Sequence, residues 1–228
     1  MKLSISPLTN DFDSIYLQNM WILSKILTVL FPPQCLFCKK ENVSLCMECI
    51  YACSKAVETP HKWIYTTYSY KNASIKKCMQ LIKYYHRKDL IEPIVKSTLN
   101  HSLFDFIKNK ENSILVPIPS PVRRVLMRGY NHAELLAQAY SKELNIPLTS
   151  NLLLRDHYTP QQAKTRDKSD RKKNISHAFS INPLSHFITS KHIILIDDTT
   201  TTGLTLAEAK KTLEQFGFNH IQAITIAH

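Results

Sequence analysis

Four cysteines in the first quarter of the chain have the spacing of a metal site. Cys35, Cys38, Cys46 and Cys49 form two C-x2-C pairs separated by seven residues. Each pair can bind one ion through two thiolates, and four soft ligands in a short loop favour tetrahedral Zn²⁺. We expect the zinc to be structural, because four thiolates leave no coordination position open. A redox dithiol or an iron–sulfur centre is the alternative, and Cys53 could compete as a ligand.

A second chemical group follows the apolar run of residues 192–196. Asp197 and Asp198 come first, and a threonine-rich turn around Gly203 follows. Backbone N–H groups before a helix and threonine hydroxyls can hold a phosphate, whereas carboxylates accept hydrogen bonds from sugar hydroxyls. The predicted ligand is therefore a ribose 5-phosphate unit. Alternatives are a polar loop without a ligand and a Walker B strand. The predicted contacts are Asp197, Asp198, Thr199, Thr200, Thr201, Thr202, Gly203 and Thr205.

Basic residues near a predicted strand end suit a pyrophosphate. Arg123, Arg124 and Arg128 follow the strand-like residues 114–118, and each guanidinium can present a fork of donors. The alternative is that they are exposed, solubilising arginines. The polar residues 155–174 could close over an anion as a lid, or could be a solvated loop. Its candidate contacts are Lys164, Arg166 and Arg171.

Residues 75–88 predict an amphipathic helix with one positive side. Lys83, Arg87 and Lys88 could contact DNA phosphates, and the neighbouring Tyr84 and Tyr85 could stack on unpaired bases. The alternative is that the aromatic pair belongs to the core.

The elements around these groups predict a doubly wound α/β fold with a parallel sheet. Residues 114–118, 192–196 and 221–227 have the pattern of strands. Capping boxes at Asn131 and Thr205 would open two intervening helices, and Gly217 would end the second. Ligands of such sheets bind outside the carboxyl ends of the strands, which is where the acidic pair lies.

Composition limits the class of protein and its location. The 228 residues include 29 Lys+Arg against 18 Asp+Glu, a net charge of +11, and are 44% hydrophobic. The three glycines are too widely spaced for a Walker A loop or a G-x-G-x-x-G fingerprint. The apolar residues 15–31 are too short and too polar for a membrane span or a signal peptide, so we expect a cytoplasmic protein.

Three segments are expected along the chain. Residues 1–19 form a leader with little pattern, which would be disordered or absent if translation starts at Met20. Residues 20–60 hold an N-terminal helix and the zinc-binding module, and residues 61–228 form the α/β domain.

Residues 193–205 resemble the phosphoribosyl-pyrophosphate (PRPP) signature of type I phosphoribosyltransferases, in which four hydrophobic residues and two acids precede a T-T-G-x-T turn. The resemblance implies that the acids hold the ribose hydroxyls, that residues 201–205 hold the 5-phosphate, and that Mg²⁺ accompanies PRPP. One departure is Thr201, where purine-salvage members tend to carry an acid.

The order of motifs is similar to the ComF family of competence proteins over residues 20–228. It comprises the four cysteines, the basic helix, V-P-I-P, R-G-Y-N, Arg171-x-x-Asn174 and the PRPP signature. The departures are His132, where glutamine is usual, and a lid about one residue out of register. The resemblance implies a cytoplasmic, PRPP-binding protein that handles single-stranded DNA during natural transformation, with other DNA-uptake proteins as partners. It leaves open whether the chain transfers phosphoribosyl groups. The alternatives are an active phosphoribosyltransferase of nucleotide salvage, using PRPP and Mg²⁺, and a non-catalytic adaptor.

Overall fold

The computed structural model describes residues 30–53, 55, 61–107, 110–155, 178–183 and 192–228. The chain divides into two compact units, Met1–Cys46 and Met47–His228. Most of the N-terminal helix expected after Met20 and the candidate lid residues Lys164, Arg166 and Arg171 lie outside the described residues. The segment boundaries expected from the sequence, at residues 20 and 61, remain predictions.

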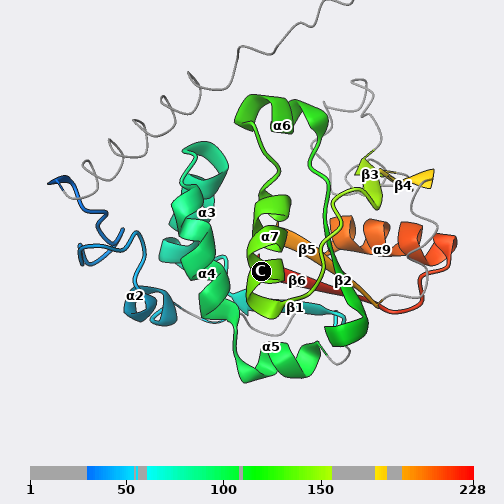
Figure 1. The fold of residues 1–228 in the computed structure, drawn as a ribbon, viewed down its shortest axis with the longest axis horizontal. Coiled ribbons are helices and arrows are strands. Elements are labelled where there is room, and N and C mark those ends of the chain that lie inside the picture. The colour runs from blue at the N-terminus through cyan, green and yellow to red at the C-terminus, as the bar shows by residue number, and fades with distance from the viewer. Residues whose placement is uncertain (1–29, 54, 56–60, 108–109, 156–177, 184–191) are drawn as a thin grey trace, which may run out of the picture. The chain divides into compact units, whose positions relative to one another are not determined.

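A parallel sheet of four strands is the centre of the second unit (Figure 1). Its spatial order is β1-β6-β5-β2, and every neighbouring pair is parallel. The predicted α/β fold class with a parallel sheet is confirmed. β1 was not predicted. The strands are β1 (Ile64–Tyr68), β2 (Ser113–Pro117), β5 (His192–Thr199) and β6 (Ile221–Ala227).

Helices cover both faces of β5, whose residues Ile193, Ile194, Leu195 and Ile196 are fully buried. Ile193 and Leu195 share a core with the apolar stripe of α9 (Leu204–Phe216), and the intervening residues point to the opposite face. Helix α7 (His132–Leu144) packs on β5 and β2, and it also contacts α4 (Ile91–Thr98). An uninterrupted apolar strand is thus buried from both sides.

The connections leave β2 and β5 in opposite directions. After β2 the chain passes through α7 and returns beside β2, where Leu148 bridges Leu115 in parallel. After β5 it passes through α9 and returns as β6 on the other side of β5. The carboxyl ends of β2 and β5 therefore flank a topological switch point, where open α/β sheets bind their ligands.

The helix predicted over residues 75–88 is shorter than expected. The observed α3 (Ala73–Tyr84) is capped by Asn72, whose side chain accepts the N–H groups of Ser74 and Ile75. The chain then turns at His86, whose φ of 55° lies in the left-handed region, so Arg87 and Lys88 are not on this helix.

The predicted capping box at Thr205 is wrong, whereas the one at Asn131 marks the right residue. The Asn131 side chain accepts the N–H of Ala133 at the start of α7. In α9 the cap position is occupied by Gly203, with φ 72°, so Thr205 lies inside the first turn. The hydroxyl of Thr200 instead accepts the N–H of Gly203.

Short elements complete the second unit. β3 (Leu153–Arg155) and β4 (Phe179–Ile181) form an antiparallel pair. The others are α2 (Met47–Tyr51), the 3₁₀ turns η1 (Lys88–Leu90) and η2 (Lys110–Asn112), α5 (His101–Phe106) and α6 (Val122–Arg128). Figure 1 shows α6 standing away from the sheet on two extended connections.

The described part of the first unit is a tight loop around two of the cysteines. The N–H of Cys35 donates to the carbonyl of Lys40, and the N–H of Lys39 donates back to the carbonyl of Cys35. Lys39 and Asn42 have positive φ angles of 65° and 64°. The chain thereby reverses between Cys35 and Cys46.

Candidate functional site

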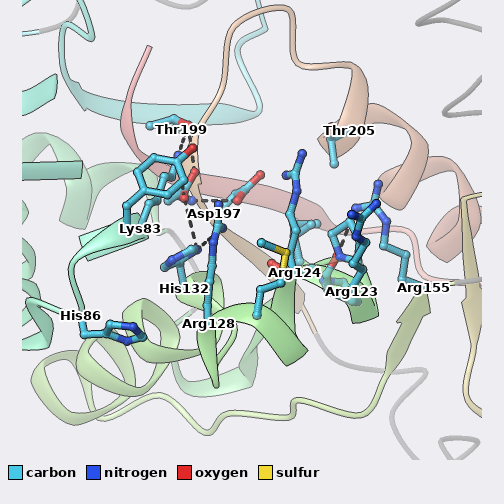
Figure 2. Close-up of a pocket in the computed structure, with 17 residues that line it drawn as sticks. Lys83, His86, Arg123, Arg124, Arg128, His132, Arg155, Asp197, Thr199 and Thr205 are labelled. Atoms are coloured by element: carbon cyan, nitrogen blue, oxygen red, sulfur yellow. Dashed lines mark hydrogen bonds and ion pairs between the residues drawn. The ribbon is translucent and has the colours of Figure 1, made fainter. Parts of the chain in front are cut away.

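A cleft of about 860 Å³ opens at the carboxyl ends of β2 and β5 (Figure 2). Its lining comes from the end of α3, the segment after β2, α6, the start of α7, β3, the end of β5 and the start of α9. The charged and imidazole side chains among the lining residues are Lys83, His86, Arg123, Arg124, Arg128, His132, Arg155, Asp197 and Asp198.

An ion pair holds the second carboxylate of the acidic pair. Lys83 Nζ lies 2.9 Å from Asp198 Oδ2 and donates to Thr199 Oγ1 at 3.2 Å. Thr199 in turn donates its hydroxyl to Asp198 Oδ1 at 2.8 Å. Lys83, expected from the sequence to face DNA, therefore reaches into the cleft and supplies a positive charge beside the acids.

The first carboxylate has an unusual protonation equilibrium. Burial at the floor of the cleft, together with the neighbouring charge of Asp198, raises the pKa of Asp197 to about 7. The N–H of Asp198 donates to Asp197 Oδ1 at 2.8 Å, which partly offsets this rise. Asp197 can therefore gain or lose a proton near neutral pH.

His132 lies beside Asp198 and is only 3% exposed. Its Nδ1 lies 4.0 Å from Asp198 Oδ2 and 3.5 Å from Nη1 of Arg128. Burial lowers the pKa of His132, and the positive charges of Arg128 and Lys83 lower it further, against the attraction of Asp198. Its Nε2 is buried without a hydrogen-bond partner among the described residues.

Four arginines contribute to the cleft, and only three were anticipated. Arg123, Arg124 and Arg128 come from α6, whereas Arg155 comes from β3 and donates to the carbonyl of Pro119 at 3.2 Å. Figure 2 shows Arg123 and Arg155 side by side towards Thr205, with Arg128 towards His132. The sequence includes Arg155 only as the first residue of the candidate lid, and the pairing of β3 with β4 places it in the cleft.

The threonine turn is divided between two hollows. Thr199 and Thr205 line the cleft. The intervening residues line a neighbouring, much smaller hollow with His61, Ile64 and His228; they are Thr200, Thr201, Thr202 and Gly203. The structure therefore brings the acids, two threonines and the arginines into one cleft. Residues 200–203, the middle of the turn, line the smaller hollow instead.

The remaining candidate DNA contacts are engaged outside the cleft. Arg87 forms an ion pair with Asp89 at 2.8 Å, and Lys88 Nζ lies 4.4 Å from the centre of the Tyr130 ring. Tyr84 and Tyr85 are 61% and 69% exposed, so the alternative that this aromatic pair belongs to the core is wrong.

The four predicted metal ligands form one cluster. Ligand atoms of Cys35, Cys38, Cys46 and Cys49 all lie within 4.8 Å of one another. The Sγ of Cys46 is 3.7 Å from that of Cys35 and 3.6 Å from that of Cys38. A tetrahedron with Zn–S bonds of about 2.3 Å has edges of about 3.8 Å, so this donor set fits zinc.

Two further observations bear on the cysteine cluster. Burial opposes ionisation of Cys35, but hydrogen bonds from the backbone of Cys38, Cys46 and Phe37 lower its pKa to about 6, which favours a thiolate ligand. Cys53, considered a competing ligand, is outside the cluster, and its thiol lies 3.5 Å from the carbonyl of Cys49.

Fold and site together define an α/β protein with a charged cleft at a strand-end switch point and a four-cysteine cluster near its N-terminus. No protein-family model matches the chain. Curated relatives nevertheless agree with one another: the chain is similar to proteins named as competence and DNA utilization proteins, which confirms the predicted resemblance to the ComF family.

Three relatives illustrate the match. Competence protein F of Haemophilus influenzae is 36% identical over 113 residues, which is 50% of this chain and 49% of that protein. Competence protein ComFC of Streptococcus pneumoniae is 28% identical over 199 residues, 85% of this chain and 79% of that protein. The DNA utilization protein YhgH of Escherichia coli is 32% identical over 108 residues, 47% of this chain and 46% of that protein. The matches to the first and third thus span about half the length of those relatives.

Within the described residues, no helix combines the length and the apolar character that crossing a membrane requires.

Proposed function

We propose that this chain is a cytoplasmic protein of DNA uptake that binds PRPP, or a related ribose 5-phosphate ligand, and handles single-stranded DNA. Relatives named as competence and DNA utilization proteins support the role in DNA uptake. One observation carries the ligand: an acidic pair and four arginines meet in one cleft at the switch point of the sheet.

The charges of the cleft suit the two ends of PRPP. Asp197 and Asp198 can accept hydrogen bonds from the ribose hydroxyls, and the arginines can bind the pyrophosphate oxygens. Mg²⁺ would neutralise part of the pyrophosphate charge. We assign the ion to the phosphate oxygens and not to Asp198, because Lys83 already binds Oδ2 of that carboxylate at 2.9 Å.

Asp197 favours a second candidate, an active phosphoribosyltransferase of nucleotide salvage. A carboxyl group with a pKa of about 7 can exchange a proton with an incoming base at neutral pH. This candidate predicts release of pyrophosphate from PRPP, with Mg²⁺, that depends on one of the common bases. The absence of release with every base would argue against this candidate and would leave PRPP binding without transfer.

Thermal unfolding with and without PRPP and Mg²⁺ tests the shared requirement. At a ligand concentration of 100 Kd, a ligand specific for the native state stabilises it by about 2.7 kcal/mol. We expect this shift in the wild type and in Asp105→Ala, an exposed carboxylate on α5, and its loss in the double variant Asp197→Asn, Asp198→Asn. Equal shifts in both variants, or none in the wild type, would refute the proposed ligand.

A further inference from the structure

Exposed apolar and aromatic side chains lie on two elements that line the cleft, the end of α3 and α6. Tyr84 and Tyr85, at the end of α3, are 61% and 69% exposed, and Leu126 and Met127, on α6, are 80% and 74% exposed. Tyr84 and Met127 also line the cleft. We call these four residues, together with Arg123, Arg124 and Arg128, the cleft rim.

The apolar side chains of α6 are not buried by the described part of the chain. Helix α6 buries none of its residues, although four of them are apolar and three of these, Val122, Leu126 and Met127, are exposed, and it stands off the sheet (Figure 1). Exposed apolar groups of this size are costly in water, and a cluster of them marks a surface that something else covers.

Charge and ring geometry indicate what covers it. α6 has the sequence V-R-R-V-L-M-R, with three arginines and no acid. The guanidinium carbon of Arg128 lies 4.9 Å from the centre of the Tyr84 ring, so cation and aromatic ring form one composite surface. A partner must therefore offer negative charge and flat apolar faces at close spacing.

We propose that the cleft rim binds single-stranded DNA, with bases stacked on Tyr84 and Tyr85 and phosphates on the arginines of α6. This inference rests on the proposed handling of single-stranded DNA and locates the DNA-binding surface at the cleft rim. A duplex would present its phosphates but hide its base faces, so the aromatic and apolar part of the rim favours an unpaired strand. An acidic protein segment would match the arginines but leave the stacked tyrosine without a counterpart.

The rim keeps the two tyrosines expected from the sequence to stack on bases, and its arginines replace the three expected cations Lys83, Arg87 and Lys88. Those three cations are engaged elsewhere, because Lys83 binds Asp198, Arg87 pairs with Asp89 and Lys88 lies over the Tyr130 ring. The arginines of the rim come from α6 and not from α3, and Tyr84 and Tyr85 remain exposed. DNA and the cleft ligand would thus meet at a common edge.

Fluorescence anisotropy with a labelled oligo-dT of about 20 nucleotides, at several salt concentrations, tests the assignment on the zinc-loaded full chain. Stacking contributes about 1–3 kcal/mol per base, so Tyr84→Ala with Tyr85→Ala should weaken binding about tenfold or more with an unchanged salt slope. Tyr84→Phe with Tyr85→Phe should retain binding, because each ring keeps its π face. Arg123→Ala with Arg124→Ala should reduce the slope of log K against log salt by about 1.4, or about 0.7 for each phosphate contact to a single strand.

Two control variants share these residue types away from the rim. Phe104→Ala, a 47% exposed aromatic on α5, and Lys142→Ala, an exposed cation on α7, should leave affinity and slope unchanged. Thermal unfolding of each variant separates loss of contact from loss of fold.

Two results would overturn this assignment alone: rim variants that bind as tightly as the wild type, or control variants that lose as much affinity as the rim variants. No binding by the wild type overturns both this inference and the proposed handling of DNA, and binding of an acidic peptide instead would assign the rim to a protein.

Discussion

The two carboxyl groups at the end of β5 differ in burial and in the charges beside them. Asp198 is compensated by Lys83 and Thr199, whereas Asp197 has no cation at ion-pair distance within the described residues and titrates near pH 7. The molecule therefore places a carboxylate that is paired with a lysine next to a carboxyl group that titrates near neutral pH. Holding Asp197 ionised in this position costs folding free energy.

Asp197→Asn should therefore stabilise the fold in a pH-dependent way. The folded pKa of about 7 lies above the reference value of 3.8, so the folded protein retains a proton that the unfolded chain loses between these values, and wild-type stability falls as pH rises through this window. Asparagine keeps an oxygen for the N–H of Asp198. We expect the variant to exceed the wild type by on the order of 1–4 kcal/mol at pH 8, and by much less at pH 4.5, in urea unfolding. An equal difference at both pH values would contradict this prediction.

At the scale of elements, the start of α9 depends on one backbone conformation. Gly203 caps the helix with φ 72°, and a Cβ added there would lie 2.8 Å from Cδ2 of His61. Gly129 has a similar φ of 77°, but an added Cβ would meet nothing within 4 Å. A side chain introduced at either position would therefore strain the backbone, but only at residue 203 would it also collide with a neighbouring side chain.

Gly203→Ala should consequently destabilise the protein more than Gly129→Ala. Strain from a left-handed non-glycine residue costs about 1–2 kcal/mol at either site, and the contact with His61 adds to it only at residue 203. Urea denaturation of the two variants and the wild type measures both costs. Equal losses would show that His61 moves aside freely.

Elements with a clear burial pattern could be predicted from the sequence. β5, β6 and α7 were recognised because a continuous apolar run and a cap at Asn131 are local signals. β1 was missed because its ends, Ile64 and Tyr68, are buried through pairing with β6, more than 150 residues away. The end of α3 was overestimated, since helix propensity continues past Tyr84 while the left-handed His86 turns the chain.

The candidate site was predictable where its residues lie at or just after strand ends, and not where tertiary contacts bring residues in. Asp197, Asp198 and the α6 arginines belong to the first kind. Lys83 joins Thr199 across 116 residues of sequence, and Arg155 arrives through a three-residue strand. No local pattern reports such distant pairings.

At the scale of the whole molecule, the cysteine cluster should supply folding free energy through its metal. The described residues around Cys35 make turns and few buried apolar contacts, so coordination replaces a core there. We expect one equivalent of zinc per chain by elemental analysis, and its loss in Cys38→Ser together with a lower unfolding midpoint. Cys53→Ala, which removes a thiol outside the cluster, should keep the metal. Zinc retained by Cys38→Ser but lost from Cys53→Ala would reverse the assignment of ligands.

Lys83 and Tyr84 are consecutive residues, yet one binds Asp198 inside the cleft and the other forms part of its rim. Arg128 lies over the Tyr84 ring and also reaches His132 beside Asp198, so an anion bound in the cleft would change the charge that a strand meets at the rim. If both proposed ligands bind, occupancy of the cleft and of the rim is energetically linked, and linkage is reciprocal: whatever factor the sugar phosphate imposes on the affinity for the strand, the strand imposes on the affinity for the sugar phosphate.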